Sequence, residues 1–274
     1  MKQLEELFVQ YKHSAPKNIE ELPSSGSNRR YFRLTADDDS TIIGVMGTSE
    51  DENIAFVKIA EHFRRQGLPV PEVYGMSEDK KFYIQQDLGD NILFKMTEKG
   101  RTCGSFNEDE REMLRKTMAK LPSLQFLGAE GLDFNVCYPQ PEFDERMISF
   151  DLNYFKYCFL KTTGLEFSEI KLHEDMTKMA ADLLEGGNAE TFMYRDFQAR
   201  NVMLVNDNPY FIDFQGGRKG PLYYDLASFV WQAKANYPTE LKETLIETYR
   251  EALKPYKDIP KEEFYRKLRL FVLF

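Results

Sequence analysis

The sequence has few cysteines, histidines and tryptophans, and it has no excess of basic charge. Its 274 residues include three cysteines, three histidines and one tryptophan, and 45 acidic against 36 basic side chains give a net charge of −9. Three cysteines cannot all pair, and Cys103, Cys137 and Cys158 lack metal-ligand spacing, so we expect free thiols in a reducing cytoplasm. The acidic balance gives no electrostatic reason to expect nucleic acid or an anionic membrane as a partner.

Long hydrophobic runs are also absent. No stretch approaches the roughly 20 apolar residues of a membrane-spanning helix, and the charged N-terminal segment is unlike a signal peptide. Apolar residues still make up 42% of the chain, enough for one large domain or two lobes. The chain stops inside an apolar pattern at Phe274, so we expect the native protein to continue, with a possible further domain beyond this residue.

The N-terminal part of the sequence alternates short strands with helices. Apolar periodicity predicts helices over residues 4–11 and 51–66. Alternating or β-branched runs predict strands at 31–34, 41–46 and 82–84. These elements predict a small, mostly β lobe over residues 1–88.

The rest of the chain, residues 89–274, is predicted to be mainly helical. Its longest helix is expected over residues 107–126, with Asn107 as the N-cap and Glu110 completing a capping box. Further helices are expected over residues 142–163, 168–184, 226–234, 240–253 and 261–274, with Gly186 and Gly187 stopping the second of these.

Two acids and an amide stand among short apolar runs within this helical part. Asp196 precedes Asn201 by five positions, and the strand 202–205 follows at once. A strong turn signal at residues 206–209 then leads to a second apolar run that ends at Asp213. The pattern predicts a loop followed by a β-hairpin, which returns Asp213 to the neighbourhood of Asp196 and Asn201.

These three side chains suit phosphoryl transfer. One carboxylate, Asp196, can orient a substrate hydroxyl and accept its proton, and the phosphoryl transition state needs little base strength. An amide oxygen and a second carboxylate, from Asn201 and Asp213, are hard ligands that suit Mg²⁺ on nucleotide phosphates. The alternative for each is a turn or a helix cap.

The segment from Tyr194 to Asn201 (YRDFQARN) and that from Phe211 to Ser228 (FIDFQGGRKGPLYYDLAS) resemble the H-x-D-x-x-x-x-N and D-F-G pair of protein-kinase-like proteins. They resemble the aminoglycoside phosphotransferase family more closely, and within it the anomeric N-acetylmuramate/N-acetylglucosamine sugar kinases. The resemblance implies an α+β, bilobal protein-kinase-like fold. It also implies ATP- and Mg²⁺-dependent phosphorylation of a small molecule, with the anomeric hydroxyl of an amino sugar favoured.

The resemblance extends to neighbouring residues. It implies that Asp225 braces the catalytic loop, although this residue could equally cap the helix that follows it. Arg195 is expected to be structural, and Arg200 could reach the acceptor or the transferring phosphate. Histidine is not expected to act as the base, because all three histidines lie far from this segment in the sequence.

Nucleotide contacts are expected from two segments of the small lobe. Small residues with free backbone N–H groups can approach phosphates closely, and the loop that could do so holds Ser25, Gly26, Ser27 and Asn28. An ordinary hairpin loop is the alternative. By resemblance, Gln86, Asp87 and Leu88 belong to the hinge between the lobes, where backbone groups would contact adenine.

The chief departure from the kinase pattern lies on the strand 41–46, which has no lysine. Arg30 or Arg33 on the preceding strand is expected to supply the missing charge. The acid that anchors it could be Glu50 or Glu52.

Two features of the sequence could belong to a substrate pocket, and they do not identify the substrate. The helix 142–163 is rich in aromatic residues, which we expect mainly in the core, although some could line a sugar pocket: Phe143, Phe150, Tyr154, Phe155, Tyr157 and Phe159. Arg218 and Lys219 could meet an anionic substrate or form a solvated basic pair.

The alternative acceptors are an aminoglycoside or a choline-like metabolite. The alternative in a different class is a nucleotide-binding pseudokinase that regulates another domain.

Overall fold

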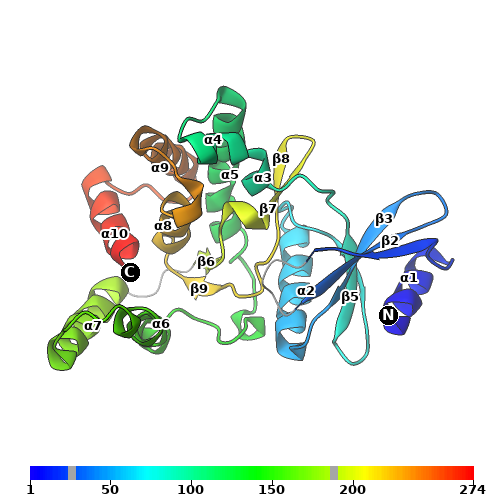
Figure 1. Cartoon of the computed structure of the whole chain (residues 1–274), viewed down its shortest axis with the longest axis horizontal. Helices are drawn as coiled ribbons and strands as arrows, with labels where there is room; N and C mark the ends of the chain where they lie inside the picture. The colour runs from blue at the N-terminus through cyan, green and yellow to red at the C-terminus, as the bar shows by residue number, and fades with distance from the viewer. Residues whose placement is uncertain (24–28, 186–190) are drawn as a thin grey trace.

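The computed structural model describes residues 1–23, 29–185 and 191–274, and it has two lobes (Figure 1). The smaller lobe holds a five-stranded antiparallel sheet in the order β1-β2-β3-β5-β4. Its strands are β1 (Asn18–Glu21), β2 (Arg30–Thr35), β3 (Thr41–Met46), β4 (Val73–Met76) and β5 (Phe82–Gln86). The small β-rich lobe predicted from the sequence is confirmed.

Side chains alternate between the two faces of this sheet, and each face packs on a different helix. Phe32 and Leu34 of β2 belong to a cluster with α1 (Lys2–Lys12). Val45 and Tyr83 point to the other face and pack with the side chains of α2 (Glu50–Arg65). Tyr31 lies opposite Val45 in the β2–β3 register, so the odd-numbered residues of β2 share the α2 face.

The larger lobe is helical, as predicted. Asn107 and Glu110 form the predicted capping box at the start of the longest helix. Ser168 caps α7 by accepting the N–H of Lys171. The α-helices are α3 (Leu93–Met96), α4 (Glu98–Cys103), α5 (Glu108–Phe126), α6 (Glu145–Cys158), α7 (Glu169–Leu184), α8 (Tyr223–Val230), α9 (Thr239–Leu253) and α10 (Lys261–Leu273). Short 3-10 turns are η1 (Phe134–Val136), η2 (Leu160–Thr162), η3 (Ala199–Asn201) and η4 (Ala233–Ala235).

Two short antiparallel pairs lie between the sheet and the helices. β6 (Thr191–Met193) pairs with β9 (Arg218–Gly220). β7 (Val202–Val205) and β8 (Asn208–Phe211) form the predicted hairpin. Its turn residues, Asn206 and Asp207, have φ values of 50° and 60°, the left-handed pair that a tight hairpin turn requires.

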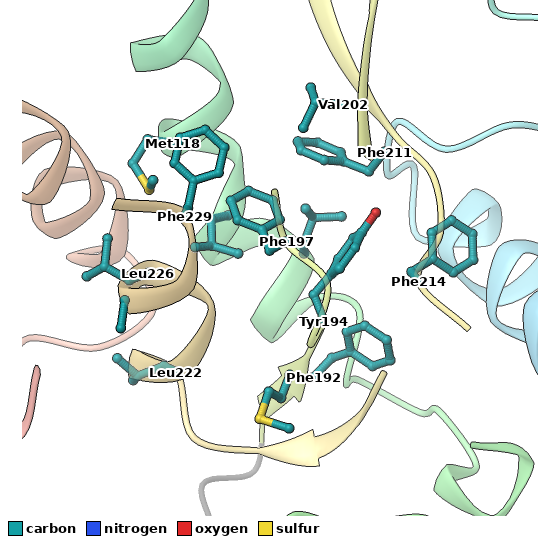
Figure 2. Close-up of a cluster of buried hydrophobic side chains, with 14 of the residues drawn as sticks. Met118, Phe192, Tyr194, Phe197, Val202, Phe211, Phe214, Leu222, Leu226 and Phe229 are labelled. Atoms are coloured by element: carbon teal, nitrogen blue, oxygen red, sulfur yellow. The ribbon is translucent and has the colours of Figure 1, made fainter. Parts of the chain in front are cut away.

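A single buried cluster connects the two lobes. Phe56 and Phe63 of α2 lie against Phe214, with ring centroids 4.9 and 5.4 Å apart. Phe63 also meets Phe192 of β6 edge-on at 4.9 Å. Figure 2 shows Phe192, Tyr194, Phe197, Phe211 and Phe214 gathered in this region. The segment after β8 that contains Phe214, called the metal loop below because Asp213 is the expected metal ligand, therefore packs on the small lobe's helix α2 as well as on the large lobe.

The prediction that the aromatic residues around α6 belong mainly to the core is wrong. Phe143 is buried, but the other five are 45% to 65% exposed: Phe150, Tyr154, Phe155, Tyr157 and Phe159. Aromatic spacing on a helix predicts an apolar face, but it does not say what covers that face.

Two composition-based expectations can be compared with the structure. Cys103, Cys137 and Cys158 are all free, as expected. Within the three described stretches of chain, no helix is both long enough and apolar enough to cross a bilayer. The proposed division at residue 88 remains a prediction, although the five-stranded sheet is complete by Gln86.

Candidate active site

The expected catalytic loop begins where β6 ends, and Asp225 of α8 holds its backbone. One carboxylate oxygen of Asp225 accepts the N–H of Tyr194, and the other accepts the N–H of Arg195, both at 2.8 Å. Arg195 has a φ of 78°, an uncommon conformation for a bulky residue. The Asp225 carboxylate therefore stabilises a strained turn immediately before Asp196, the contact that the expected brace requires.

Tyr194 fixes the same loop from the side of the hydrophobic core. Its ring lies among Phe197, Phe211 and Phe214 (Figure 2). Its hydroxyl donates a hydrogen bond to the carbonyl oxygen of Ile212. Tyr194 therefore connects the catalytic loop to the residue that precedes Asp213.

Asp196 lies in a largely buried environment. Burial raises the pKa of its carboxyl to about 6, and the negative charge of Asp213 acts in the same direction. The positive charges of Arg195, Arg218 and Arg200 oppose this rise. Asp196 is therefore a stronger proton acceptor than an exposed aspartate, and it is still mostly ionised near neutral pH.

Asn201 and Asp213 are brought to Asp196 by backbone contacts. The side-chain amide nitrogen of Asn201 donates to the carbonyl oxygen of Asp196 at 2.8 Å. The N–H of Ile212 donates to the Asn201 carbonyl at 3.1 Å. A Cβ atom at Gly216 would lie 3.4 Å from Asp196 Oδ2, so the segment after Asp213 passes directly by the Asp196 carboxylate. The predicted grouping is thus present.

Asp213 has the side-chain chemistry of a metal ligand. Its φ is 67°, and its Oδ1 accepts a hydrogen bond of 2.6 Å from the side-chain amide of Gln215. The nitrogen end of the Asn201 amide is engaged by Asp196, which leaves its oxygen end for a ligand. A carboxylate and an amide oxygen are the ligand types that Mg²⁺ prefers. Gln215 was not among the site residues expected from the sequence.

Arg30 does not reach this group. Its guanidinium pairs with Glu21 on β1, at 2.7 and 2.6 Å. It also lies over the ring of Phe32, on the α1 face. The alternation of side chains along β2 therefore places Arg30 on the side of the sheet away from Asp213, which corrects its expected nucleotide role.

Arg33 lies on the α2 face of the sheet, but it pairs with Asp87 of the expected hinge and with Asp90. It donates to Asp87 at 2.6 and 3.2 Å and to Asp90 at 3.3 and 2.9 Å. Burial acts to raise the pKa of Asp87, but the hydrogen bonds from Arg33 and the Gly89 amide hold it below its usual value. Arg33 thus has two carboxylate partners, so the expectation that it supplies charge to the phosphates is not supported.

The other expected hinge residues lie where β5 ends. The N–H of Gln86 donates to the carbonyl oxygen of Glu72 at 2.8 Å, so this amide is already used. Leu88 is half-buried beyond it. The expected phosphate loop, Ser25, Gly26, Ser27 and Asn28, lies outside the described residues, as do Gly186 and Gly187.

Arg29, which the sequence analysis missed, is the small-lobe cation beside Asp213. Its guanidinium lies 3.8 Å from Asp213 Oδ1 and 3.6 Å from Glu52 Oε1, and its side chain is only 5% exposed. Burial acts to lower its pKa, and the surrounding Tyr83, Tyr31, Glu52 and Asp213 outweigh that effect and raise it. The signal was available, because Arg29 stands two positions before Tyr31 and shares its face of the sheet.

A cavity of about 590 Å³ opens beside Arg195 and is lined by residues of α6, α8 and α10. Its charged lining residues are Asp151 and Arg195, which form a two-point ion pair of 2.7 and 2.8 Å. Its aromatic lining consists of Tyr154, Phe155, Phe159, Tyr224, Trp231, Phe271 and Phe274. Exposed aromatic residues of α6 therefore face a pocket next to the catalytic loop.

The remaining basic residues lie in contrasting environments. Arg200 is exposed. Arg218 is 2% exposed and donates to the Gly216 carbonyl, so the alternative of a solvated basic pair is wrong for this residue. Burial, with the nearby charge of Arg195, lowers the pKa of Arg218 to about 10.

The two lobes and the Asp196–Asn201–Asp213 group define a phosphotransferase of the protein-kinase-like class. The chain matches the phosphotransferase enzyme family over residues 18–265 and belongs to it.

Curated relatives are similar to this chain over most of its length. It is 27% identical over 248 residues to an N-acetylmuramate/N-acetylglucosamine kinase of Neisseria meningitidis, covering 87% of this chain and 69% of the relative. It is 27% identical over 241 residues to the kinase of that name from Pseudomonas aeruginosa, covering 86% and 66%. The chain therefore spans about two thirds of the length of these relatives.

Solved structures share the fold at low identity. The ADP-bound aminoglycoside phosphotransferase APH(2'')-Ib has a TM-score of 0.58 and 14% identity, with 97% of this chain and 96% of that chain covered. Choline kinase from Cryptosporidium parvum has a TM-score of 0.65 and 12% identity, with 93% and 80% covered. Both comparisons confirm the predicted fold class, a small antiparallel lobe with a helical lobe.

Proposed function

We propose that this protein uses ATP and Mg²⁺ to phosphorylate a hydroxyl group of an amino sugar, at the anomeric position. The observation that carries the proposal is the meeting of Asp196, Asn201 and Asp213, with an aromatic cavity at Arg195, the residue before Asp196. The nucleotide-bound state of related folds and the names of the curated relatives support it. We also propose a cytoplasmic location, from the free cysteines.

Each residue of the group has a distinct task. Asp196, next to the cavity-lining Arg195, orients the acceptor hydroxyl and accepts its proton as the phosphoryl group transfers. Asn201 and Asp213 supply oxygen ligands for Mg²⁺, which when bound neutralises charge on the nucleotide phosphates. Asp225 holds the loop in its strained conformation through the two backbone N–H groups that it accepts.

The charge of the cavity favours an amino sugar over a polycationic acceptor. Its one lining carboxylate, Asp151, is already neutralised by Arg195. A polycationic aminoglycoside would need several unpaired carboxylates, and the described lining offers none. Aromatic faces instead suit the apolar face of a sugar ring, and the Asp151–Arg195 pair keeps spare acceptors and donors for hydroxyl or acetamido groups.

The test is coupled ADP release with MgATP and a panel of acceptors: N-acetylmuramate, N-acetylglucosamine, an aminoglycoside and choline. We expect turnover on at least one N-acetylated sugar, with the phosphate resolved by NMR on the anomeric oxygen. Turnover on the aminoglycoside or choline alone would contradict the acceptor proposal. Tight ATP binding without turnover on any acceptor would instead indicate a regulatory pseudokinase.

A further inference from the structure

The small lobe must place positive charge near the nucleotide phosphates if the proposed function is correct. In protein-kinase-like enzymes a strand lysine does this, but β3 has no lysine along Thr41–Met46. Arg30 is paired on the far face of the sheet and Arg33 is committed to the hinge. Among the described residues of this lobe, Arg29 in the segment before β2 is the arginine that lies beside Asp213.

Arg29 has the position and surroundings that this task requires. It lies on the sheet face that points to α2 and the metal loop, next to Tyr31 and Tyr83. Its two carboxylate neighbours come from different elements, Glu52 from the first turn of α2 and Asp213 from the segment after β8. Arg29 is thus the point where the sheet, the helix and the metal loop meet.

The distances place the guanidinium of Arg29, and not that of Arg33, beside the proposed metal ligand. Arg29 lies 3.8 Å from Asp213 and 3.6 Å from Glu52, whereas Arg33 pairs with Asp87 and Asp90 at 2.6 and 2.9 Å. Glu52 and Asp213 have side chains 35% and 39% exposed, whereas the Arg29 side chain is 5% exposed. A nearly buried guanidinium is weakly screened by solvent, so a phosphate oxygen at its edge would interact with it strongly.

Glu52 is well placed to hold this cation. Ser49 caps α2 and accepts the N–H of Glu52 at 3.3 Å, which fixes the first helical turn. Between the two acids that the sequence left open, the structure favours Glu52, because Glu50 lies 3.6 Å from Lys81 at the surface. The arginine and the helix glutamate thus form the small-lobe ion pair, although the cation comes from the segment before β2.

We propose that Arg29, held by Glu52, binds the phosphates of the nucleotide in place of the missing strand lysine. This inference rests on the proposed nucleotide-dependent function. Arg29 contributes phosphate affinity and leaves recognition of the nucleoside to the hinge.

The test compares phosphorylated and unphosphorylated ligands on the full chain. MgATP, MgADP and adenosine are titrated against a bound fluorescent N-methylanthraniloyl-ADP in the native protein and in Arg29→Gln. We expect Arg29→Gln to weaken MgATP about ten- to hundred-fold, the usual effect of losing a charge-assisted hydrogen bond. Adenosine affinity should change less than about two-fold. Arg29→Lys should recover part of the preference for MgATP over adenosine.

The neighbouring arginine provides the matched control. Arg30→Gln removes a guanidinium one position away whose ion pair with Glu21 is exposed, and it should leave all three affinities unchanged. Arg29→Met, which fills much of the same buried volume, replaces Arg29→Gln if the latter does not fold.

Two outcomes would overturn the inference, and they have different meanings. Equal loss of adenosine and MgATP affinity in Arg29→Gln, or no loss of either, would make Arg29 a purely structural partner of Glu52. The proposed function would survive that result. Absence of any nucleotide binding by the native protein would overturn the function and the inference together.

Discussion

Two aspartates of the catalytic region have different partners, and this difference assigns them different tasks. Asp225 directs both carboxylate oxygens at backbone N–H groups. Asp196 instead accepts the Asn201 amide through its backbone carbonyl oxygen, and its carboxylate is the group that we propose as the proton acceptor. A substitution of Asp225 should therefore affect stability, and a substitution of Asp196 should affect turnover.

Asp196→Asn should lower kcat by about 10²- to 10⁴-fold, the usual contribution of a positioned proton acceptor. The amide keeps the size of the carboxylate and removes only its charge and basicity. MgATP affinity and the thermal midpoint should stay close to those of the native protein. Steady-state kinetics and nucleotide titration together test this, and a variant with near-native kcat would exclude Asp196 as the proton acceptor.

Asp225→Asn should change how stability depends on pH. Burial raises the pKa of Asp225 from 3.8 to about 7, and the N–H groups of Tyr194 and Arg195 partly oppose it. A raised pKa means that the folded protein binds the proton more tightly, so the contribution of Asp225 to stability is greatest at low pH and falls as pH rises through about 7. The native free energy of unfolding, measured relative to Asp225→Asn by urea titration, should therefore decrease from about pH 5 to 7 and then level off. An increase over this range would contradict the assigned shift.

Some of these residues could be found from the sequence and others could not. Asp196, Asn201 and Asp213 are joined by one hairpin, so local turn chemistry predicts that they meet. Asp151 and Arg195 are 44 positions apart, and only the packing of α6 brings them together. Arg29 was missed because it precedes its strand, although the alternation of β2 extends to it.

At the scale of secondary structure, helices and strands were predicted correctly where neighbouring residues alone determine the element. Capping residues and helical periodicity predicted α1, α2, α5, α7, α9 and α10 closely. β6 and β9 are three residues each, and they exist because distant segments pair; their sequences contain no local signal of that length. The aromatic run of α6 was recognised as a helix face, but its exposure depends on a cavity built from three helices.

The aromatic residues of α6 should contribute to acceptor binding only where they line that cavity. Phe155→Ala should raise the acceptor KM by roughly ten-fold, because an aromatic contact with the ligand is worth about 1 kcal/mol or more. Phe150→Ala provides the control on the same helix, since Phe150 is 62% exposed and lies outside the cavity lining. The KM for MgATP should be unchanged in both. Equal effects of the two substitutions on the acceptor KM would argue against this cavity as the acceptor site.

At the scale of the whole molecule, the two lobes form one hydrophobic unit. The largest buried cluster includes Val45 and Phe56 of the small lobe together with Phe214 and Leu226 of the large lobe. A bilobal chain was predictable from the change of pattern near residue 88, but a shared core was not. Interlobe packing depends on which faces remain uncovered after each lobe folds, and local patterns do not contain that information.

A shared core predicts that damage to the small lobe destabilises the large one. Phe63 of α2 is fully buried against Phe192 and Phe214, so Phe63→Ala should cost about 3–5 kcal/mol of stability. Trp231, the one tryptophan of the chain, reports on the large lobe. Its fluorescence transition in urea should therefore shift to lower concentration and coincide with the loss of helical circular dichroism, because the protein unfolds as one cooperative unit. An unshifted Trp231 transition, with part of the circular dichroism lost earlier, would mean that the lobes unfold independently and that the cluster does not couple them.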